Sequence, residues 1–360
     1  MKLKINNINL NFNKGKGSII NSHPDIEIER IKLLREIERD AKRKFNLPNT
    51  FLLSDLYIYT DKKNNDPVMC KLETEIEDEK KLYKFLNKRT KEAIILLKKI
   101  NTTRFDNSKI NKKTKKTVFV LTYNNETIII KKNQYYRIKK LIIDKTFEKY
   151  FTFDTLIWML FYRYDRLHLY NNSQGAVHPK YYTEFSNKYK TNVEAFGSFF
   201  NHTLKYYFGL YPDLEKYFGC LGNFYLASFN KGVFIVNPPF TVIAINKTID
   251  FMLMQLSKAT ENLTFLFVIP TWSNEDRGKL NKVCKMKLKP KYDRNVRLDL
   301  LLKSNYITQY LLYCKENFTY YDYIKMQDCQ FAPSTLITLS NNKKILDIKN
   351  IFGKEDIKII

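Results

Sequence analysis

The segment Asn237-Pro238-Pro239-Phe240 combines residue types that can hold a flat, nitrogen-bearing ligand. An apolar, β-branched run precedes it and predicts a strand, which the two prolines must end because they remove two backbone donors. Asn237 offers a side-chain carbonyl, Pro238 a peptide carbonyl and Phe240 a ring face. We therefore expect the segment just beyond the carboxyl end of a strand, where open α/β sheets bind ligands. The alternative is a rigid loop between a strand and a helix.

The chemistry that suits these groups is methyl transfer to the exocyclic amine of adenine. The lone pair of that nitrogen is delocalised into the ring, so two fixed acceptors for its N–H groups would make it more nucleophilic. Stacking on Phe240 would hold the base flat and is worth about 1–3 kcal/mol. The tetrapeptide resembles the catalytic motif of amino-methyltransferases that use S-adenosylmethionine. Asn at its first position is common among enzymes that act on adenine.

The elements around this segment alternate between strands and helices. A helix through "TIDFMLMQLSKA" separates the strand that ends at Asn237 from a second strand, "LTFLFVIP". Further strands are predicted at 191–198, 308–314 and 334–340. Buried β-branched strands separated by a helix predict a mostly parallel sheet.

The first part of the chain is basic and mostly helical. Amphipathic patterns predict helices at 24–45 and 79–100, and an apolar pattern predicts a buried helix at 151–167. Two β-branched runs around Asn124-Asn125 predict a hairpin. The expected domains are a flexible tail at 1–22, a basic, mostly helical domain with a β-hairpin at 23–145, a catalytic domain at 146–345 and a C-terminal tail at 346–360.

Composition and charge narrow the class of partner. The 360 residues hold 44% apolar side chains and 62 Lys and Arg against 37 Asp and Glu, giving a formal charge of +25. Such a surface attracts polyanions, so nucleic acid is the expected partner, rather than a membrane. No signal peptide or long apolar run is evident. Five scattered cysteines and four histidines without ligand spacing predict reduced thiols, no metal site, and a nuclear or cytoplasmic location, a viral factory included, rather than secretion.

Several segments in a fixed order carry a narrower resemblance. They are "RYDRL" (163–167), "QGAVHPKYY" (174–182), "EAFGSFFN" (194–201), "YPDLEKYFG" (211–219), "GVFIVNPPF" (232–240) and "FVIPTW" (267–272). Together they resemble the catalytic region of the phosphorylated-CTD-interacting-factor family, the cap-specific adenosine N6-methyltransferases. The resemblance implies an α/β, Rossmann-like, S-adenosylmethionine-dependent methyltransferase domain beside the helical domain. It also implies N6-methylation of 2′-O-methyladenosine next to the cap of mRNA.

The chain departs from that family at its front, where we find no WW module. Both tryptophans, Trp158 and Trp272, lie inside the catalytic region. The sequence therefore offers no evidence for binding to phosphorylated polymerase tails.

Three groups of residues are assigned to the expected site. The catalytic group is Asn237, Pro238, Pro239 and Phe240. The cofactor group is Gln174, Gly175, Ala176, Glu194, Phe196, Gly197, Ser198, Asn201 and Asp213. The RNA and cap group is Trp272, Lys285, Lys287, Lys289, Lys291 and Arg294. The structural alternatives are ordinary turns at the glycines, a helix N-cap at Asn201, core packing of Trp272 and a solvated loop for the basic run.

Two other functions are compatible with the same residues. The motif also serves adenine methyltransferases that act on DNA or on internal RNA sites, where a duplex enzyme must flip the base. A non-catalytic nucleic-acid-binding subunit with this fold is the second alternative.

Overall fold

The structure is a computed structural model that describes residues 2–5, 8–12, 23–58, 66–74, 76–100, 109–169, 175–285 and 296–360. The chain forms two compact units. Unit 1 comprises residues 1–14, 173–209 and 223–360, and unit 2 comprises 15–172 and 210–222. The expected boundary at 145 is therefore wrong, because the helix after it and the later segment 210–222 both belong to unit 2.

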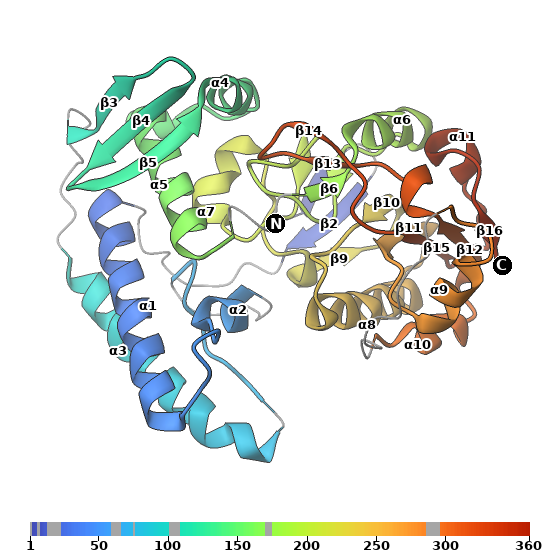
Figure 1. Cartoon of the computed structure of the whole chain (residues 1–360), viewed down its shortest axis with the longest axis horizontal. Coiled ribbons are helices and arrows are strands. Elements are labelled where there is room, and N and C mark those ends of the chain that lie inside the picture. The colour runs from blue at the N-terminus through green and yellow to red at the C-terminus, as the bar shows by residue number, and fades with distance from the viewer. Residues whose placement is uncertain are drawn as a thin grey trace. The chain divides into compact units, whose positions relative to one another are not determined.

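Unit 1 is built on a five-stranded sheet (Figure 1). Its strands, in spatial order, are β10 (Gly232–Val236), β11 (Leu263–Pro270), β15 (Ser334–Ser340), β12 (Ile307–Tyr313) and β16 (Ile357–Lys358). β10 and β11 are parallel, whereas β15 is antiparallel to both β11 and β12, and β16 is antiparallel to β12. The prediction of a mostly parallel sheet is wrong because β12 and β15 are joined by two short strands instead of a crossover helix.

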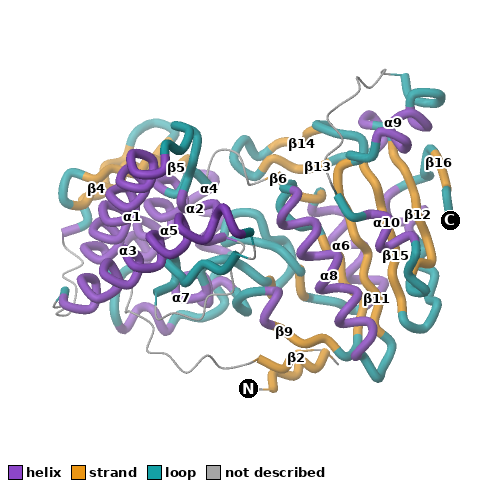
Figure 2. Tube along the Cα trace, turned by 90° about the horizontal axis from the view of Figure 1, so that it is seen from below, coloured by secondary structure: helices purple, strands orange, loops and turns teal. Residues whose placement is uncertain are grey.

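The helices α6 (Pro179–Tyr189), α8 (Val242–Lys258) and α11 (Ile348–Phe352) complete the core of unit 1, and Figure 2 shows α6 and α8 beside the long strands. Val233 and Ile235 of β10 share a buried cluster with residues of α6 and α11. Phe234, which has the opposite pleat direction, contacts Phe229 and Phe265. Both faces of β10 are therefore buried, which explains its continuous apolar sequence.

Three smaller sheets complete unit 1. β7 (Val193–Glu194) is parallel to β8 (Tyr206–Tyr207), and β6 (Gly175–Val177) pairs with β13 (Tyr320–Asp322), which pairs with β14 (Gln327–Cys329). β1 (Lys2–Ile5) and β2 (Ile8–Phe12) form a hairpin on β9 (Ala227–Phe229). The predicted N-terminal tail thus contains two strands, and the predicted C-terminal tail contains α11 and β16.

Unit 2 contains the long helices α1 (Pro24–Phe45) and α3 (Lys80–Lys99), which lie side by side in both views (Figures 1 and 2). His23 caps α1, Pro24 follows it, and Asn46 ends the helix in the left-handed conformation. α5 (Phe153–Arg166) is buried through most of its length, as predicted. β4 (Val118–Tyr123) and β5 (Glu126–Lys131) form the predicted hairpin, with Asn124 and Asn125 at positive φ.

The shorter elements occupy the rest of the described chain. They are α2 (Leu53–Ile58), β3 (Asn111–Thr114), α4 (Lys132–Lys140), α7 (Pro212–Glu215), α9 (Asn274–Leu280) and α10 (Leu298–Leu302). Among the helices of the described residues, none combines the length and apolar character needed to cross a bilayer.

Two cysteines of unit 1 are paired, contrary to the expectation of reduced thiols. Cys284 follows α9 and Cys314 follows β12, and their sulfurs form a disulfide across 30 residues. The sequence could not show this pairing, because it depends on the packing of α9 beside β12. Glu316 lies close enough to both sulfurs for a shared metal ion, but the disulfide leaves no thiolates to bind one.

Candidate active site

Asn237 lies at the carboxyl end of β10, as its sequence predicts. Val236 pairs with Phe267 of β11, which brings Asn237 level with Val268. The Asn237 Nδ2 donates to the Val268 carbonyl at 2.8 Å, and Oδ1 accepts from the Val177 backbone N–H at 3.4 Å. A flipped amide would set oxygen against oxygen and N–H against N–H, so these two partners fix its orientation.

This arrangement holds a carbonyl in place without using all of its capacity. A carbonyl oxygen has two lone pairs, and the 3.4 Å bond from Val177 is a long one for N–H···O. The turn after Asn237 is also fixed: Thr241 N donates to the Pro239 carbonyl at 2.8 Å, and the Thr241 hydroxyl caps α8. Pro238 is buried and Pro239 exposed. The motif is therefore a rigid turn that carries an oriented acceptor.

Phe240 lies beside this acceptor and is half-buried. Its ring centroid is 5.9 Å from that of Tyr320 and 5.5 Å from that of Phe331. Burial raises the pKa of the Tyr320 phenol, which forms a hydrogen bond of 2.7 Å with Ser334 Oγ. Tyr320 is thus a neutral, fixed support, and the aromatic face predicted from Phe240 alone is a group of three rings.

The glycine turn predicted for the cofactor follows β7 and lies next to β10. Ala195 N donates to the Ile235 carbonyl at 3.4 Å, and Gly197 N donates to the Phe208 carbonyl at 2.9 Å. A Cβ at Gly197 would lie 3.0 Å from Tyr207 Cβ, so close packing against Tyr207 requires glycine here. Phe196 packs against Phe224 and is half-buried. The structure therefore brings this turn to the strand that carries Asn237.

Two polar residues of that turn hold the turn itself. Glu194 is 1% exposed, and its Oε1 accepts from the backbone N–H groups of Thr203 and Leu204. Asn201 Oδ1 accepts from Ser198 N at 2.8 Å and from Ser198 Oγ at 3.1 Å, and no helix begins there. Glu194 Oε1 and Asn201 Oδ1 therefore position the turn, and Asn201 is not a helix N-cap; the assignment of both residues to the cofactor stays a prediction.

Asp213 is not a cofactor residue. It belongs to unit 2, where its two carboxylate oxygens accept from Arg163 Nη1 and Nη2, each at 2.8 Å. Arg163 also binds Glu27, which binds Arg30, and Arg30 binds Asp66, so five charged side chains form a buried network. The sequence could not reveal this role, because the ion partner lies 50 residues away.

The RNA and cap residues have mixed outcomes. Trp272 follows β11 at the same sheet edge as Asn237, as predicted, but it is 8% exposed. This burial favours the packing alternative, and the role of Trp272 as a platform for the cap stays a prediction. Lys285 is exposed, and its backbone N–H donates to Glu316. Gln174, Lys287, Lys289, Lys291 and Arg294 lie outside the described residues.

Sequence reasoning found Gly175 and Ala176 but missed why they matter. They lie on β6, whose next residue, Val177, donates to Asn237. Backbone partners such as Val177 and Val268 leave no residue-type signal. Phe331 was also missed; it is 42% exposed and lies against Phe240, but nothing marks it among 26 phenylalanines.

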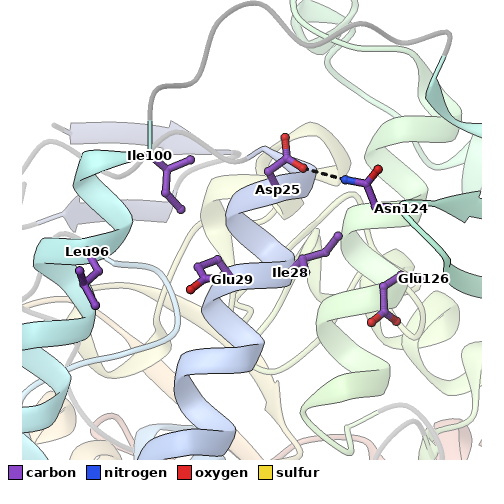
Figure 3. Close-up of a pocket in the computed structure, with 7 residues that line it drawn as sticks. All are labelled: Asp25, Ile28, Glu29, Leu96, Ile100, Asn124 and Glu126. Atoms are coloured by element: carbon purple, nitrogen blue, oxygen red, sulfur yellow. Dashed lines mark hydrogen bonds between the residues drawn. The ribbon is translucent and has the colours of Figure 1, made fainter.

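A separate cavity of about 480 Å³ lies in unit 2 (Figure 3). Its lining residues are Asp25, Ile28, Glu29, Leu96, Ile100, Asn124 and Glu126. Figure 3 shows Asp25 joined to Asn124 by a hydrogen bond, with Glu29 and Glu126 on neighbouring elements. Three carboxylates would repel a phosphate chain, so this cavity does not suit a nucleic acid and the Asn237 edge remains the candidate site.

The fold and site together define a mixed helix and sheet protein with an amino-methyltransferase motif at a sheet edge. Residues 131–297 match the family model described as "Phosphorylated CTD interacting factor 1 WW domain". This match confirms the resemblance to the phosphorylated-CTD-interacting-factor family over a segment that contains Asn237.

Two curated relatives are similar to part of the chain. The mRNA (2′-O-methyladenosine-N(6)-)-methyltransferase of Homo sapiens is 25% identical over 165 residues, and that of Mus musculus is 24% identical over 166 residues. Each alignment covers 43% of this chain and 23% of the relative. The chain thus spans under a quarter of the length of these relatives.

The description of the family model corrects one expectation. It names a WW domain, so the prediction that this chain lacks such a module is not supported. The matched segment contains both tryptophans, which are 0% and 8% exposed, together with β10 and β11. The segment so described is therefore the one that holds the candidate active site, and it does not precede that site.

Proposed function

We propose that this chain is an S-adenosylmethionine-dependent RNA methyltransferase that methylates N6 of the adenosine next to an mRNA cap, with 2′-O-methyladenosine as the natural acceptor. The observation that carries the proposal is the oriented amide of Asn237 beside the ring of Phe240 at the end of β10. The names of the two curated relatives support the substrate. The parallel β10–α8–β11 unit with its site at the carboxyl edge supports a Rossmann-like fold.

The chain's own residues would act on the amine and on the base. Asn237 Oδ1 and the Pro238 carbonyl would accept hydrogen bonds from the two N–H hydrogens of N6. Phe240 would stack on the adenine and hold it in the plane of those acceptors. Because Val177 and Val268 fix Asn237 beforehand, little reorganisation would be needed during the reaction.

The residues of the β7 turn fit the cofactor. S-adenosylmethionine would supply an electrophilic methyl group. Phe196 and Gly197 are half-buried next to the strand that carries Asn237, and the Phe196 ring lies 5.9 Å from that of Tyr225. Gly197, which has no side chain, would allow the methionine part to approach the backbone, and the aromatic pair Phe196 and Tyr225 would contact the adenine part.

The charge of the chain supports a nucleic acid as substrate, and the names of the two curated relatives favour mRNA. The net charge of +25 favours a polyanion, and exposed Lys285 begins the basic run assigned to phosphate contacts. We propose that the protein works in the nucleus or in a cytoplasmic compartment where mRNA is made, and that it does not require a membrane.

The test is methyl transfer to matched RNAs that begin with A and carry either a cap or a 5′-triphosphate, followed by nucleoside analysis. We expect N6-methyladenosine or its 2′-O-methyl form in the capped RNA, and far less in the uncapped one. Asn237→Ala serves as the control for the site. Equal rates on both RNAs, or a preference for duplex DNA, would favour an adenine methyltransferase with other substrates. Absence of cofactor binding would favour a non-catalytic subunit.

A further inference from the structure

Phe331 is an exposed aromatic side chain placed against the motif ring. It lies between β14 and β15 and is 42% exposed, although most large apolar side chains of unit 1 are buried. Its ring centroid is 5.5 Å from that of Phe240, with the planes at 46°. Exposed aromatic surface next to a polar site is typical of a binding contact.

Phe331 is also supported by fixed structure, through a ring that contacts both Phe331 and Phe240. Its centroid is 4.2 Å from that of Tyr320, which is 0% exposed and bonded to Ser334. Tyr320 pairs in register with Val177, the donor to Asn237. Phe331 is thus connected to the candidate acceptor through a buried ring and one strand pair.

Gly175 leaves space beside the same ring. A Cβ at Gly175 would lie 3.9 Å from Phe331 Cε1, so the glycine is next to Phe331 and adds no side chain over it. Gly175 is itself exposed. Of the residues that the structure describes, Gly175 therefore leaves the nearby edge of Phe331 uncovered by a side chain of its own.

The ring geometry decides where a base could lie. Centroids 5.5 Å apart place Phe240 and Phe331 in direct contact, so no base fits between them. The two rings instead form one continuous aromatic surface, with Phe240 nearer the Asn237 turn. One planar group can lie on Phe240 and a second on Phe331.

We propose that Phe331 is a substrate-binding residue that stacks on the base joined to the target adenosine, a proposal that rests on the proposed function. The ligand class is a nucleobase covalently linked to the acceptor nucleotide. It comes either from the cap guanine on one side or from the following nucleotide on the other. Sequence-tolerant stacking of this kind accounts for an apolar ring that is kept exposed beside a polar site.

The experiment uses the full chain with Phe331→Ala and Phe331→Trp, and with Leu302→Ala as a matched control. Leu302 is 46% exposed on α10 of the same unit. The probes are a capped five-nucleotide RNA beginning with A, the same RNA without the cap, and the capped RNA with an abasic second nucleotide. Binding is measured directly, and S-adenosylmethionine binding is measured alongside.

We expect Phe331→Ala to weaken the binding of capped RNA by about 5- to 150-fold, the equivalent of one stacked base, and to leave cofactor binding unchanged. Leu302→Ala should change neither. Stacking of a base should quench the fluorescence of the indole in Phe331→Trp when the intact RNA is added. The natural tryptophans, Trp158 and Trp272, are buried and should contribute little to this change. Loss of quenching without the cap identifies the guanine, and loss with the abasic RNA identifies the second nucleotide.

Two outcomes would overturn the proposal. The first is RNA affinity of Phe331→Ala no weaker than that of Leu302→Ala, and the second is an indole signal that intact RNA leaves unchanged. If wild-type protein methylates RNA in either case, only the role of Phe331 fails. If the indole is quenched but no methyl transfer occurs, the base contact stands and the proposed function fails.

Discussion

Asn237 in unit 1 and Asp213 in unit 2 are each 8% exposed, yet their surroundings differ in one respect. Both carboxylate oxygens of Asp213 accept from Arg163 at 2.8 Å, inside a network of five charged side chains. Asn237 commits its amide nitrogen to Val268 but leaves acceptor capacity on Oδ1. Burial of a polar side chain therefore does not by itself mark a functional site. An oriented side chain that keeps unused hydrogen-bonding capacity is the better indication.

The largest expected effect comes from opening the network of unit 2. Arg163→Met should lower the free energy of unfolding by about 3–5 kcal/mol, because Asp213 would remain buried without its partner and Glu27 would keep only Arg30. Arg166→Met, on the same helix, removes a partly exposed pair with Glu126 and should cost less than about 1 kcal/mol. Denaturant titration of both variants checks this difference, and equal losses would contradict the importance of burial.

A substitution at Asn237 in unit 1 should change the rate of methyl transfer and not the folding of the protein. Asn237→Ala should slow methyl transfer by about 10²–10³-fold, the usual cost of one preorganised transition-state contact, with S-adenosylmethionine affinity retained. Asp213→Asn is the matched control: it should destabilise the protein but leave cofactor affinity per folded molecule unchanged. Single-turnover assays and cofactor titrations measure both. Turnover of Asn237→Ala near that of the wild type would remove the central claim.

A smaller effect is expected at Phe240. Phe240→Ala should weaken RNA binding by about 1–3 kcal/mol and lower turnover, because stacking both holds and orients the adenine. Phe240→Tyr keeps an aromatic face and should retain more activity. Saturation curves with capped RNA measure both variants. If Phe240→Leu performs as well as the Tyr variant, the side chain contributes only packing.

The smallest expected effect is a change of stability with pH. It should involve the charged network of unit 2 and not the neutral side chain of Asn237. Burial raises the pKa of Glu27, but Arg163 and Arg30 outweigh this and hold that pKa below its usual value of 4.5. Its stabilisation is thus fully present above about pH 4.5 and is lost as the pH falls through the lower, folded-state pKa. Unfolding measured from pH 7 to pH 3 should show this decline. Glu27→Gln should flatten it, whereas Asn237→Ala, which removes a neutral group, should leave its shape unchanged.

Local patterns predicted the elements of this protein better than their arrangement. β11, β15, α1 and the hairpin at Asn124-Asn125 follow from apolar runs, caps and turn residues, all of which are encoded within a few positions. The antiparallel insertion of β15 and the assignment of segment 210–222 to unit 2 depend on contacts between distant residues.

The site shows the same division. Asn237 and Phe240 could be predicted because the two prolines between them end the strand and fix the local backbone, which makes the motif recognisable from consecutive residues. The burial of Trp272 could not be predicted, because the type of a residue does not determine its exposure. Asp213 was misassigned because its partner, Arg163, lies 50 positions earlier. Phe331 carries no motif at all, and only its contact with Phe240 distinguishes it.

Because each unit is built from separate stretches of the chain, the order of synthesis determines when each unit can fold. Arg163 cannot meet Asp213 until 50 more residues have been added, which takes about 3–10 s at ribosomal rates. β2 waits longer still, since its partner β9 begins at Ala227. Neither unit can finish folding before parts of the other have been made. Both units therefore complete their cores late, with distant pairings that slow folding and leave apolar surface open to chaperones in the meantime.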